Sequence, residues 1–373
     1  MLIDYILPFL FILTIVVFVH EFGHFWVARK NGVQVETFSI GFGREIFGFT
    51  DKHGTRWKFA LLPLGGYVKM FGDADETSSK ADDREMTEEE KAIAFPHKTV
   101  GQRAAIIAAG PFANLAFAIV VLSILFMTVG QPSTPPVIGS VMAESAAEKA
   151  GLQSGDRVLV IDGEKIDRFE DIQRKVKLSA GEALKMRLER SGTDIELLVV
   201  PQIKEFTDKS GNVQKTPLLG IGAGGGETTF VKYGPGGALV QSFVHTWRVI
   251  EGTFSALGQM ISGKRGTEEL GGPLRIAQYS GHAAQGGPAN FIYFIAILSI
   301  NLGLINLFPV PMLDGGHLLF CAIEKIKGAP LGQNLQEYGF RIGVILVLAL
   351  MVFSTWNDIV HLRVWDFIKG LVS

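Results

Sequence analysis

The feature that most limits how this chain can fold is a set of long apolar runs. Residues 104–129 contain only three polar side chains in 26 positions, and residues 5–28 and 291–313 are nearly as apolar. About 20 consecutive apolar residues cross a bilayer as a helix. A fourth run, residues 342–353, reaches this length only with its flanks, residues 338–356. The sequence therefore predicts a polytopic α-helical membrane protein with about four transmembrane helices.

The composition agrees with this class. Hydrophobic residues make up 47 % of the 373 residues, and charged residues make up 19 %. The net charge of −2, without a long basic run, gives no sign of nucleic-acid binding. Cys321 is the only cysteine, so one chain can form neither a disulfide nor a cysteine zinc site. The first residues lack the basic region and cleavage site of a secretory signal, so we expect the first run to remain as an anchor.

Basic residues predict the orientation of the chain. Lys and Arg flank the loop between the first two runs and the loop between the last two, whereas residues 130–148 contain none. Because cytoplasmic loops carry the excess of basic residues, we expect both basic loops in the cytoplasm. Both termini and residues 130–290 are then expected on the extracytoplasmic side.

The first apolar run carries ionisable residues, which are costly at membrane depth. His20, Glu21 and His24 belong to the sequence His-Glu-Phe-Gly-His, and charged or titratable residues within a span mark functional sites. Positions i and i+4 share one helix face, so both imidazoles can bind one metal ion, with Glu21 beside it to take a proton from bound water. A chance pair of histidines is the alternative, which the membrane setting disfavours.

A tetrahedral zinc site with two histidines needs a third protein ligand. Asp314 follows the third run, and His317 is the weaker alternative. Two crossings separate the far ends of the first and third runs, so the histidines and Asp314 are expected on the same side of the membrane. Pro309 and Pro311 are expected to break the helix before Asp314. Asn306 has two interpretations, an interhelical hydrogen bond or a contact with the substrate.

At these motifs the chain resembles the site-2 proteases, and more narrowly the bacterial regulator of sigma-E protease type. The resemblance rests on His-Glu-Phe-Gly-His, on Asn-Leu-Phe-Pro-Val-Pro-Met-Leu-Asp-Gly-Gly (306–316), and on Gly-Pro-Phe-Ala-Asn (110–114) between them, and it covers essentially the whole chain. It implies a zinc endopeptidase of the inner membrane with one Zn²⁺ per chain. His20, His24 and Asp314 would bind the zinc, Glu21 would be the catalytic base, and Asn306 would help to hold the substrate. From the residues alone, Gly110 and Asn114 are interpreted as helix-packing scaffold.

Residues 57–73 are apolar but too short and too interrupted by proline and glycine to span the membrane, and a strand is expected after the Gly65-Gly66 turn. The resemblance implies a hairpin that dips toward the active site. A strand edge at Gly65, Gly66 and Tyr67 would then pair with unwound substrate. An ordinary interfacial hairpin that anchors the loop is the alternative.

Residues 135–166 read as a strand, a short helix and a hairpin, and the signature Ala-Gly-Leu-x-x-Gly-Asp-x-Val resembles that of a PDZ domain. A helix is expected at 169–177 and a second hairpin at 184–200. We expect the peptide groove of this domain at Val137, Ile138, Gly139 and Ser140, where strand addition captures a partner. Only one such signature occurs, whereas well-known relatives carry two PDZ domains.

The predicted organisation is an α-helical membrane protein with an inserted α+β domain. Its parts are transmembrane helices at 1–30, 104–130, 291–320 and 338–357, a cytoplasmic loop at 31–103, the PDZ domain and its tail at 131–228, an amphipathic juxtamembrane region at 229–290, and an extracytoplasmic tail at 358–373.

The predicted activity is cleavage of peptide bonds in or near transmembrane segments. The resemblance implies the second cut of regulated intramembrane proteolysis, on single-span substrates of the anti-sigma-factor type that have already been trimmed outside. A membrane metal transporter and a non-catalytic PDZ scaffold are the alternatives. The transporter would not need Glu21, and the scaffold would leave the histidine motif unexplained.

Overall fold

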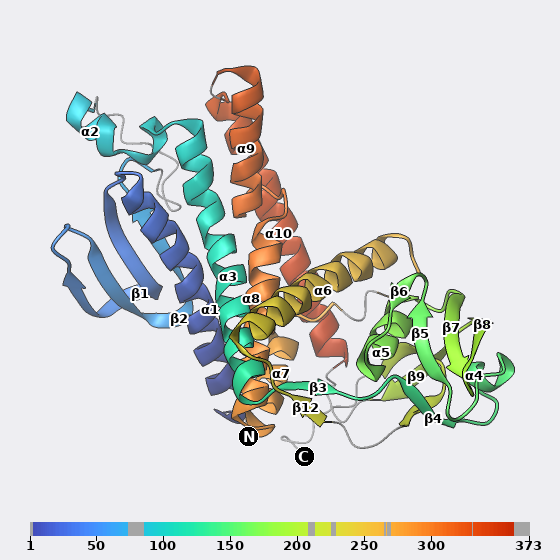
Figure 1. Ribbon diagram of the computed structural model, residues 1–373. Helices are drawn as coiled ribbons and strands as arrows, with labels where there is room; N and C mark the ends of the chain where they lie inside the picture. Colours follow the sequence, from blue (N-terminus) through green and yellow to red (C-terminus); the bar gives the residue numbers. More distant parts are fainter. Residues whose placement is uncertain are drawn as a thin grey trace, which may run out of the picture. The chain divides into compact units, whose positions relative to one another are not determined.

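The computed structural model describes residues 3–73, 86–207, 213–224, 229–264, 266, 270–329 and 331–361. Within these residues, four helices are long and apolar enough to cross a membrane, as predicted. They are α1 (Ile3–Lys30), α3 (Val100–Thr128), α8 (Pro288–Asn306) and α10 (Gln333–His361) (Figure 1). Most of the predicted C-terminal tail, residues 362–373, lies outside the described residues.

The chain divides into two compact units. The first comprises residues 1–122 and 273–353, and the second comprises residues 123–272 and 354–373. The first unit holds most of the apolar helices, together with the shorter elements α2 (Glu88–Ile93), η1 (Phe95–His97), α7 (Pro273–Gln285) and α9 (Asp314–Lys327). The second unit holds the β-rich region.

Helix α1 lies at the centre of the first unit, where it contacts α7 and α8. Most of its buried residues recur every three or four positions, which places them on one face of the helix. Gly23 on this face permits close approach of α3, since a Cβ there would lie 2.4 Å from the Ala109 carbonyl oxygen. The face consists of Ile12, Val16, His20, Gly23, His24 and Ala28. The histidines are therefore part of the helix-packing surface.

The third predicted span, 291–320, is divided by the break that was expected before Asp314. Helix α8 ends at Asn306, and α9 begins only at Asp314. Pro309 and Pro311 lie between the two helices, where a proline removes a backbone donor and clashes with the preceding turn. Asp314 consequently begins a new helix.

The predicted hairpin is longer than expected and includes a strand that the sequence pattern did not reveal. Strands β1 (Val35–Thr50) and β2 (Arg56–Met70) pair as an antiparallel two-stranded sheet with several register shifts (Figure 1). Strand β2 covers the predicted segment, but the turn predicted at Gly65-Gly66 is wrong, because both glycines lie within the strand and Gly66 pairs with Ile40. The hairpin packs on α1 through buried Phe38, which meets Phe25 edge to face at 5.5 Å.

The β-rich region of the second unit forms a sheet around its own core. Strand order is β11-β4-β5-β7-β8, with β6 paired to β5. The sheet strands are β4 (Val137–Val141), β5 (Arg157–Ile161), β6 (Glu164–Lys165), β7 (Leu184–Arg190), β8 (Thr193–Val199) and β11 (Ile221–Gly224). Helices α4 (Ala146–Lys149) and α5 (Phe169–Leu178) contribute to the core, and β9 (Gln202–Thr207) pairs with β10 (Val213–Leu218). The predicted strands, short helix and helix at 169–177 are all present.

The predicted peptide-binding edge at Val137–Ser140 is not available for strand addition. These residues form most of β4, which lies between β11 and β5 in the sheet. Ser140 pairs with Gly222 and Ile138 pairs with Ala223. A Cβ on Gly139 would lie 2.4 Å from the Ala223 carbonyl oxygen. The sequence pattern identified the strand but could not show that a segment much later in the chain would cover its edge. The terminal strand on this side of the sheet is therefore β11.

The β-rich region leaves and rejoins the rest of its unit through two adjacent strands. Strand β3 (Gln131–Ser133) follows α3, and it pairs antiparallel with β12 (Thr229–Val231), which precedes α6. The backbone of Tyr233 also donates to the Phe126 carbonyl at 3.2 Å. The two ends of the inserted segment are thus held side by side.

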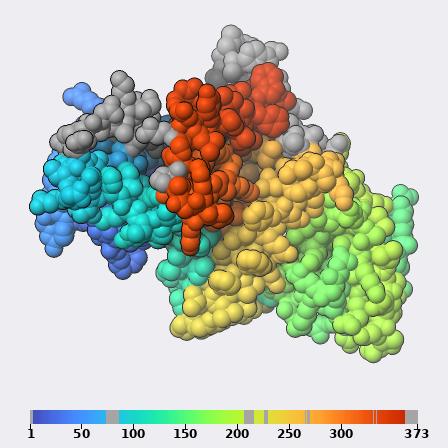
Figure 2. All heavy atoms as spheres, turned by 90° about the horizontal axis from the view of Figure 1, so that it is seen from above, coloured from blue at the N-terminus to red at the C-terminus, as the bar shows by residue number. Residues whose placement is uncertain are grey.

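An amphipathic helix was expected within residues 229–290, and α6 (Pro235–Ile261) is a long helix there with distinct buried and exposed faces. Ala238, Ser242 and Thr246 form its buried face, and the Ser242 hydroxyl lies 2.6 Å from that of Ser123 in α3. The opposite face is apolar and open at the surface, where α6 is yellow in Figure 2. Its exposed side chains are Leu239, Val240, Phe243, Trp247 and Phe254.

Candidate metal centre

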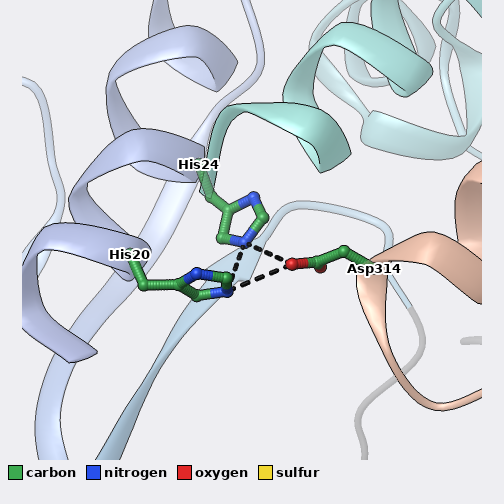
Figure 3. A group of neighbouring side chains, drawn as sticks. All are labelled: His20, His24 and Asp314. Atoms are coloured by element: carbon green, nitrogen blue, oxygen red, sulfur yellow. Dashed lines mark hydrogen bonds and ion pairs between the residues drawn. The ribbon is translucent and has the colours of Figure 1, made fainter. Parts of the chain in front are cut away.

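His20 and His24 lie one turn apart on the buried face of α1, and Asp314 approaches them from the first turn of α9 (Figure 3). His20 Nε2 lies 3.2 Å from His24 Nε2. Asp314 Oδ2 lies 3.1 Å from His20 Nε2 and 3.5 Å from His24 Nε2. All three side chains are largely withdrawn from solvent, with side-chain exposures of 10, 11 and 18 %. Among the described residues, these three form the group whose ligand atoms converge closely enough to hold a metal ion.

The separations match those of a tetrahedral zinc site. Zn–N and Zn–O bonds of about 2.0–2.1 Å in tetrahedral directions place neighbouring ligand atoms about 3.4 Å apart. The three separations here, 3.1, 3.2 and 3.5 Å, lie around that value. Asp314 Oδ2 is also buried without a well-formed hydrogen bond, which a metal bond would satisfy. Two imidazoles and one carboxylate are the donor set of a zinc hydrolase with one position left for water.

Two glycines after Asp314 allow the preceding loop to fold over the first turn of α9. A Cβ on Gly315 would lie 2.2 Å from the Phe308 carbonyl oxygen, and one on Gly316 would lie 2.4 Å from the Val310 carbonyl oxygen. Real Cβ atoms essentially never approach closer than 3.0 Å. The Asp-Gly-Gly sequence is therefore required for this loop conformation, which sets the position of the Asp314 carboxylate.

Helix α3 forms the wall of the site behind the two imidazoles. His24 Nδ1 lies 2.9 Å from the Ile106 carbonyl oxygen, and His20 Nδ1 lies 3.3 Å from Asn114 Nδ2. Gly110 lies between these two partners, and a Cβ there would come within 2.3 Å of His24 Nε2. Gly110 thus leaves the space that the rings occupy.

Glu21 belongs to the same helix as the histidines and lies beside the hairpin. A Cβ placed on Gly66 would lie 3.3 Å from Glu21 Cγ, so the Glu21 side chain lies next to the backbone of β2 at this glycine. Gly65, the preceding residue, has φ of 123°, a conformation that favours glycine. The Tyr67 ring stacks on the Phe42 ring, with 6.1 Å between the ring centroids. The hairpin segment predicted to bind substrate therefore reaches the helix that carries Glu21.

Other predicted residues lie at the edge of this arrangement or apart from it. Asn306 is the half-buried last residue of α8. His317, the alternative third ligand, is not a member of the converging group, and its ring meets Phe320 edge to face at 6.3 Å. The predicted groove residues of β4 belong to the second unit.

Sequence reasoning did not identify Gly110 and Asn114 as neighbours of the histidines, and it gave no role to the glycines after Asp314. The signal was present in the spacing, since Gly110 and Asn114 are four residues apart and share one face of α3. Which helix that face would meet depends on tertiary packing, and the motif alone could not show it.

The comparisons with known proteins agree with this arrangement. The family model for peptidase family M50 matches residues 8–350. A protein of Agrobacterium fabrum, described by its name as a presumed zinc metalloprotease, is 46 % identical over 360 residues, which cover 95 % of each chain. A Brucella suis protein with the same description is 43 % identical over 363 residues, with 96 % of each chain covered.

The regulator of sigma-E protease of Salmonella typhimurium is 34 % identical over 446 aligned positions, which cover 94 % of this chain and 97 % of that protein. The alignment is at least 73 positions longer than this chain (446 − 373), so that protein carries additional residues. Four apolar helices, a convergent His-His-Asp group and these matches lead to one conclusion: the chain belongs to peptidase family M50, the intramembrane zinc metalloproteases.

Proposed function

We propose that His20, His24 and Asp314 bind the catalytic zinc ion and that Glu21 is the general base for hydrolysis of a peptide bond in or near a transmembrane segment. The observation that carries this assignment is the convergence of the three ligand atoms at 3.1–3.5 Å. A site of this kind suits a substrate that enters through the membrane, because both histidines lie within a candidate span.

The chemistry follows from the positions of the side chains. Zinc at this site would act as a Lewis acid that makes a bound water acidic near neutral pH. The Glu21 carboxylate accepts a proton from the water that attacks the peptide carbonyl carbon. As the C–N bond breaks, Glu21 returns that proton to the leaving amide nitrogen. Glu21 is the carboxylate next to His20 in sequence, about 100° round the helix axis, so it can lie beside the metal without being one of its ligands.

The β2 hairpin is the proposed platform for the substrate backbone. A peptide bond within a helix is protected by its hydrogen bonds, so a substrate must be unwound before attack. Strand β2 pairs with β1 along one edge, and the pair forms a two-stranded sheet in the described part of the chain. An extended substrate can add to the other edge, near Gly65, Gly66 and Tyr67. Asn306, at the end of α8, is proposed to hold the same substrate.

The site is proposed to face the cytoplasmic side, with both termini outside. The basic residues that flank the predicted cytoplasmic loops support this orientation. The β-rich region is then extracytoplasmic. Its strands, its helix α5 and the Ala-Gly-Leu signature support a single PDZ-like domain. A peptide ligand of this domain would pair with β11, since β4 is already paired on both edges.

We propose that this domain acts mainly as a size filter for regulated intramembrane proteolysis. It would admit single-span membrane proteins, such as those of the anti-sigma-factor type, whose outer portion another protease has already trimmed. This chain would then make the second cut. A tether that binds the new C-terminus of the trimmed substrate is the alternative role.

The catalytic assignment is tested with Glu21→Gln in purified protein, with zinc content and substrate cleavage measured on the same sample. The variant should retain zinc and lose about 10²- to 10⁴-fold in cleavage rate, because the amide cannot accept the proton. Glu88→Gln, the same change at an exposed helix position, is the control. Cleavage by Glu21→Gln at the wild-type rate would disprove the role of general base.

The filter is tested by excision of the inserted segment at its paired ends. Because Ser133 pairs with Thr229, an Asn-Gly turn can replace residues 134–228 and retain the β3–β12 ladder. A filter predicts that untrimmed substrate is now cut, and that an unrelated folded domain in the same place blocks cleavage again. A tether predicts slower cleavage of trimmed substrate. Untrimmed substrate that stays intact after the excision would refute the filter.

A further inference from the structure

Asn114 is a fully buried polar residue that contacts a proposed zinc ligand. Its Nδ2 lies 3.3 Å from His20 Nδ1. Its Oδ1 is buried and has no hydrogen-bond partner, although a buried amide oxygen without a partner is costly. The backbone carbonyl of Asn114 accepts a hydrogen bond of 2.9 Å from the Ser299 hydroxyl of α8. Burial and the Ser299 hydrogen bond therefore hold Asn114 in place, whereas its side-chain oxygen has no hydrogen-bond partner.

The position of the ring proton on a metal-binding His20 shows which partner the Asn114 oxygen can have. A neutral histidine carries one ring proton, and the nitrogen that binds a metal must offer a lone pair. His20 Nε2 points to His24 and Asp314 (Figure 3), so the proton belongs on Nδ1. Nδ1–H is then a donor and requires an acceptor. The Asn114 amide nitrogen is also a donor and cannot serve.

Rotation of the Asn114 amide by 180° gives His20 Nδ1–H its acceptor and moves the amide nitrogen to the position that Oδ1 leaves. Amide oxygen and nitrogen have nearly the same shape, so the hydrogen-bond network decides which one faces a neighbour. With Oδ1 toward the ring, it accepts from His20 Nδ1–H, and the buried oxygen gains its partner. His24 has an equivalent acceptor, because its Nδ1 lies 2.9 Å from the Ile106 carbonyl.

We propose that Asn114 is a positioning residue whose Oδ1 accepts the His20 Nδ1–H hydrogen bond and thereby directs the His20 Nε2 lone pair to the metal. Helix α3 then supplies an acceptor to each histidine, from Ile106 and Asn114, with Gly110 midway between them as the space for the rings. The inference rests on the zinc assignment made above. It gives a chemical role to the Gly-x-x-x-Asn spacing, which was interpreted from the sequence as helix-packing scaffold only.

The test measures zinc affinity by chelator competition on detergent-solubilised protein. Every variant carries Glu21→Gln, so the readout does not depend on cleavage. Asn114→Leu removes the acceptor at similar volume, and the zinc dissociation constant should rise about 10- to 100-fold, as is typical when such a partner is lost. Asn114→Asp keeps an acceptor and cannot donate, so it should bind zinc within about 3-fold of the parent. Carboxylate–histidine–zinc is a common arrangement.

Ser299→Ala is the matched control. It removes a hydrogen bond to Asn114 at the same α3–α8 contact without touching the imidazole, and zinc affinity should not change. Equal weakening by Asn114→Asp and Asn114→Leu would overturn the proposal, because it would show a donor or packing role. Unchanged affinity in Asn114→Leu, or weakening by Ser299→Ala as large as that by Asn114→Leu, would overturn it as well. If Asn114→Leu does not fold, Asn114→Asp decides, since loss of zinc by that variant contradicts an acceptor role.

If Asp314→Ala retained zinc, the proposed metal assignment would fail instead, and that result is separate from the response to Asn114 substitutions.

Discussion

Gly110→Ala is the most stringent test of the metal centre, because the perturbation is one methyl group of known position. A Cβ at this residue would lie 2.3 Å from His24 Nε2, 2.6 Å from His24 Cε1 and 2.9 Å from His20 Cε1. In a helix, alanine is intrinsically about 1 kcal/mol more favourable than glycine. A merely structural helix position would therefore gain stability from this change.

The magnitude follows from the geometry. Since real Cβ contacts shorter than 3.0 Å are essentially absent, His24 Nε2 must retreat by at least 0.7 Å (3.0 − 2.3) or the helices must separate. Zinc–ligand distances tolerate only about ±0.2 Å. A bond between zinc and His24 Nε2 would therefore be lost or severely strained. We expect a zinc affinity at least about 100-fold weaker, which is the upper end of the loss caused by removing a supporting group.

The assay is the zinc-to-protein ratio after dialysis against a graded chelator. Gly101→Ala is the matched control, because it makes the same change in the same helix at a position with no neighbour within 4 Å. It should bind zinc as the wild type does. Wild-type zinc affinity in Gly110→Ala would refute the reasoning, because it would mean that the imidazoles do not occupy the space next to this glycine.

Three further predictions concern the third ligand and the β-rich region. Asp314→Ala should empty the zinc site, whereas His317→Ala should leave the zinc content unchanged; the opposite result by metal analysis would reassign the third ligand. Burial tends to raise the pKa of Asp156, but hydrogen bonds from the Arg190 guanidinium and the Gln153 backbone outweigh it and hold the pKa below its usual value. The ion pair thus stabilises the domain above the unfolded pKa of about 3.9 and is lost as the pH falls through the lower folded value. Asp156→Asn should lower the melting temperature at pH 7, with a difference that disappears in acid; a constant difference would exclude the ion pair as its cause. Leu188→Ala, at a fully buried position, should cost about 2–5 kcal/mol in domain stability and leave zinc affinity unchanged, and a loss below about 1 kcal/mol by denaturant titration would contradict the assigned core.

The parts of the fold that the sequence predicted are those with strong local signals. The four apolar runs were predicted as helices because the backbone has few alternatives at membrane depth. Each run contains a helix in the structure. The His20–His24 pair follows from helix geometry alone. The placement of Asp314 beside them required only the count of crossings and the proline break before it.

The parts that sequence reasoning missed depend on distant segments. Strand β1 was not recognised as the partner of β2, since Gly41, Gly43 and Gly48 interrupt its sequence pattern. The edge of β4 was expected to be free, and β11, from far along the chain, covers it. The contact of Gly110 and Asn114 with the histidines likewise depends on how α1 packs against α3, which no single helix sequence specifies.

The β3–β12 ladder has a consequence for how proteins of this family can vary. A segment whose ends are fastened together can be lengthened, duplicated or exchanged without moving the points at which the chain leaves α3 and returns to α6. Natural selection can therefore change the size of the inserted domain independently of the helices that carry the candidate metal centre. The regulator of sigma-E protease, whose alignment exceeds this chain by at least 73 positions (446 − 373), has a surplus comparable to one additional small domain. If the inserted domain selects substrates by size as proposed, a change in its size would alter substrate choice while the β3–β12 ladder keeps the connection to α3 and α6 unchanged.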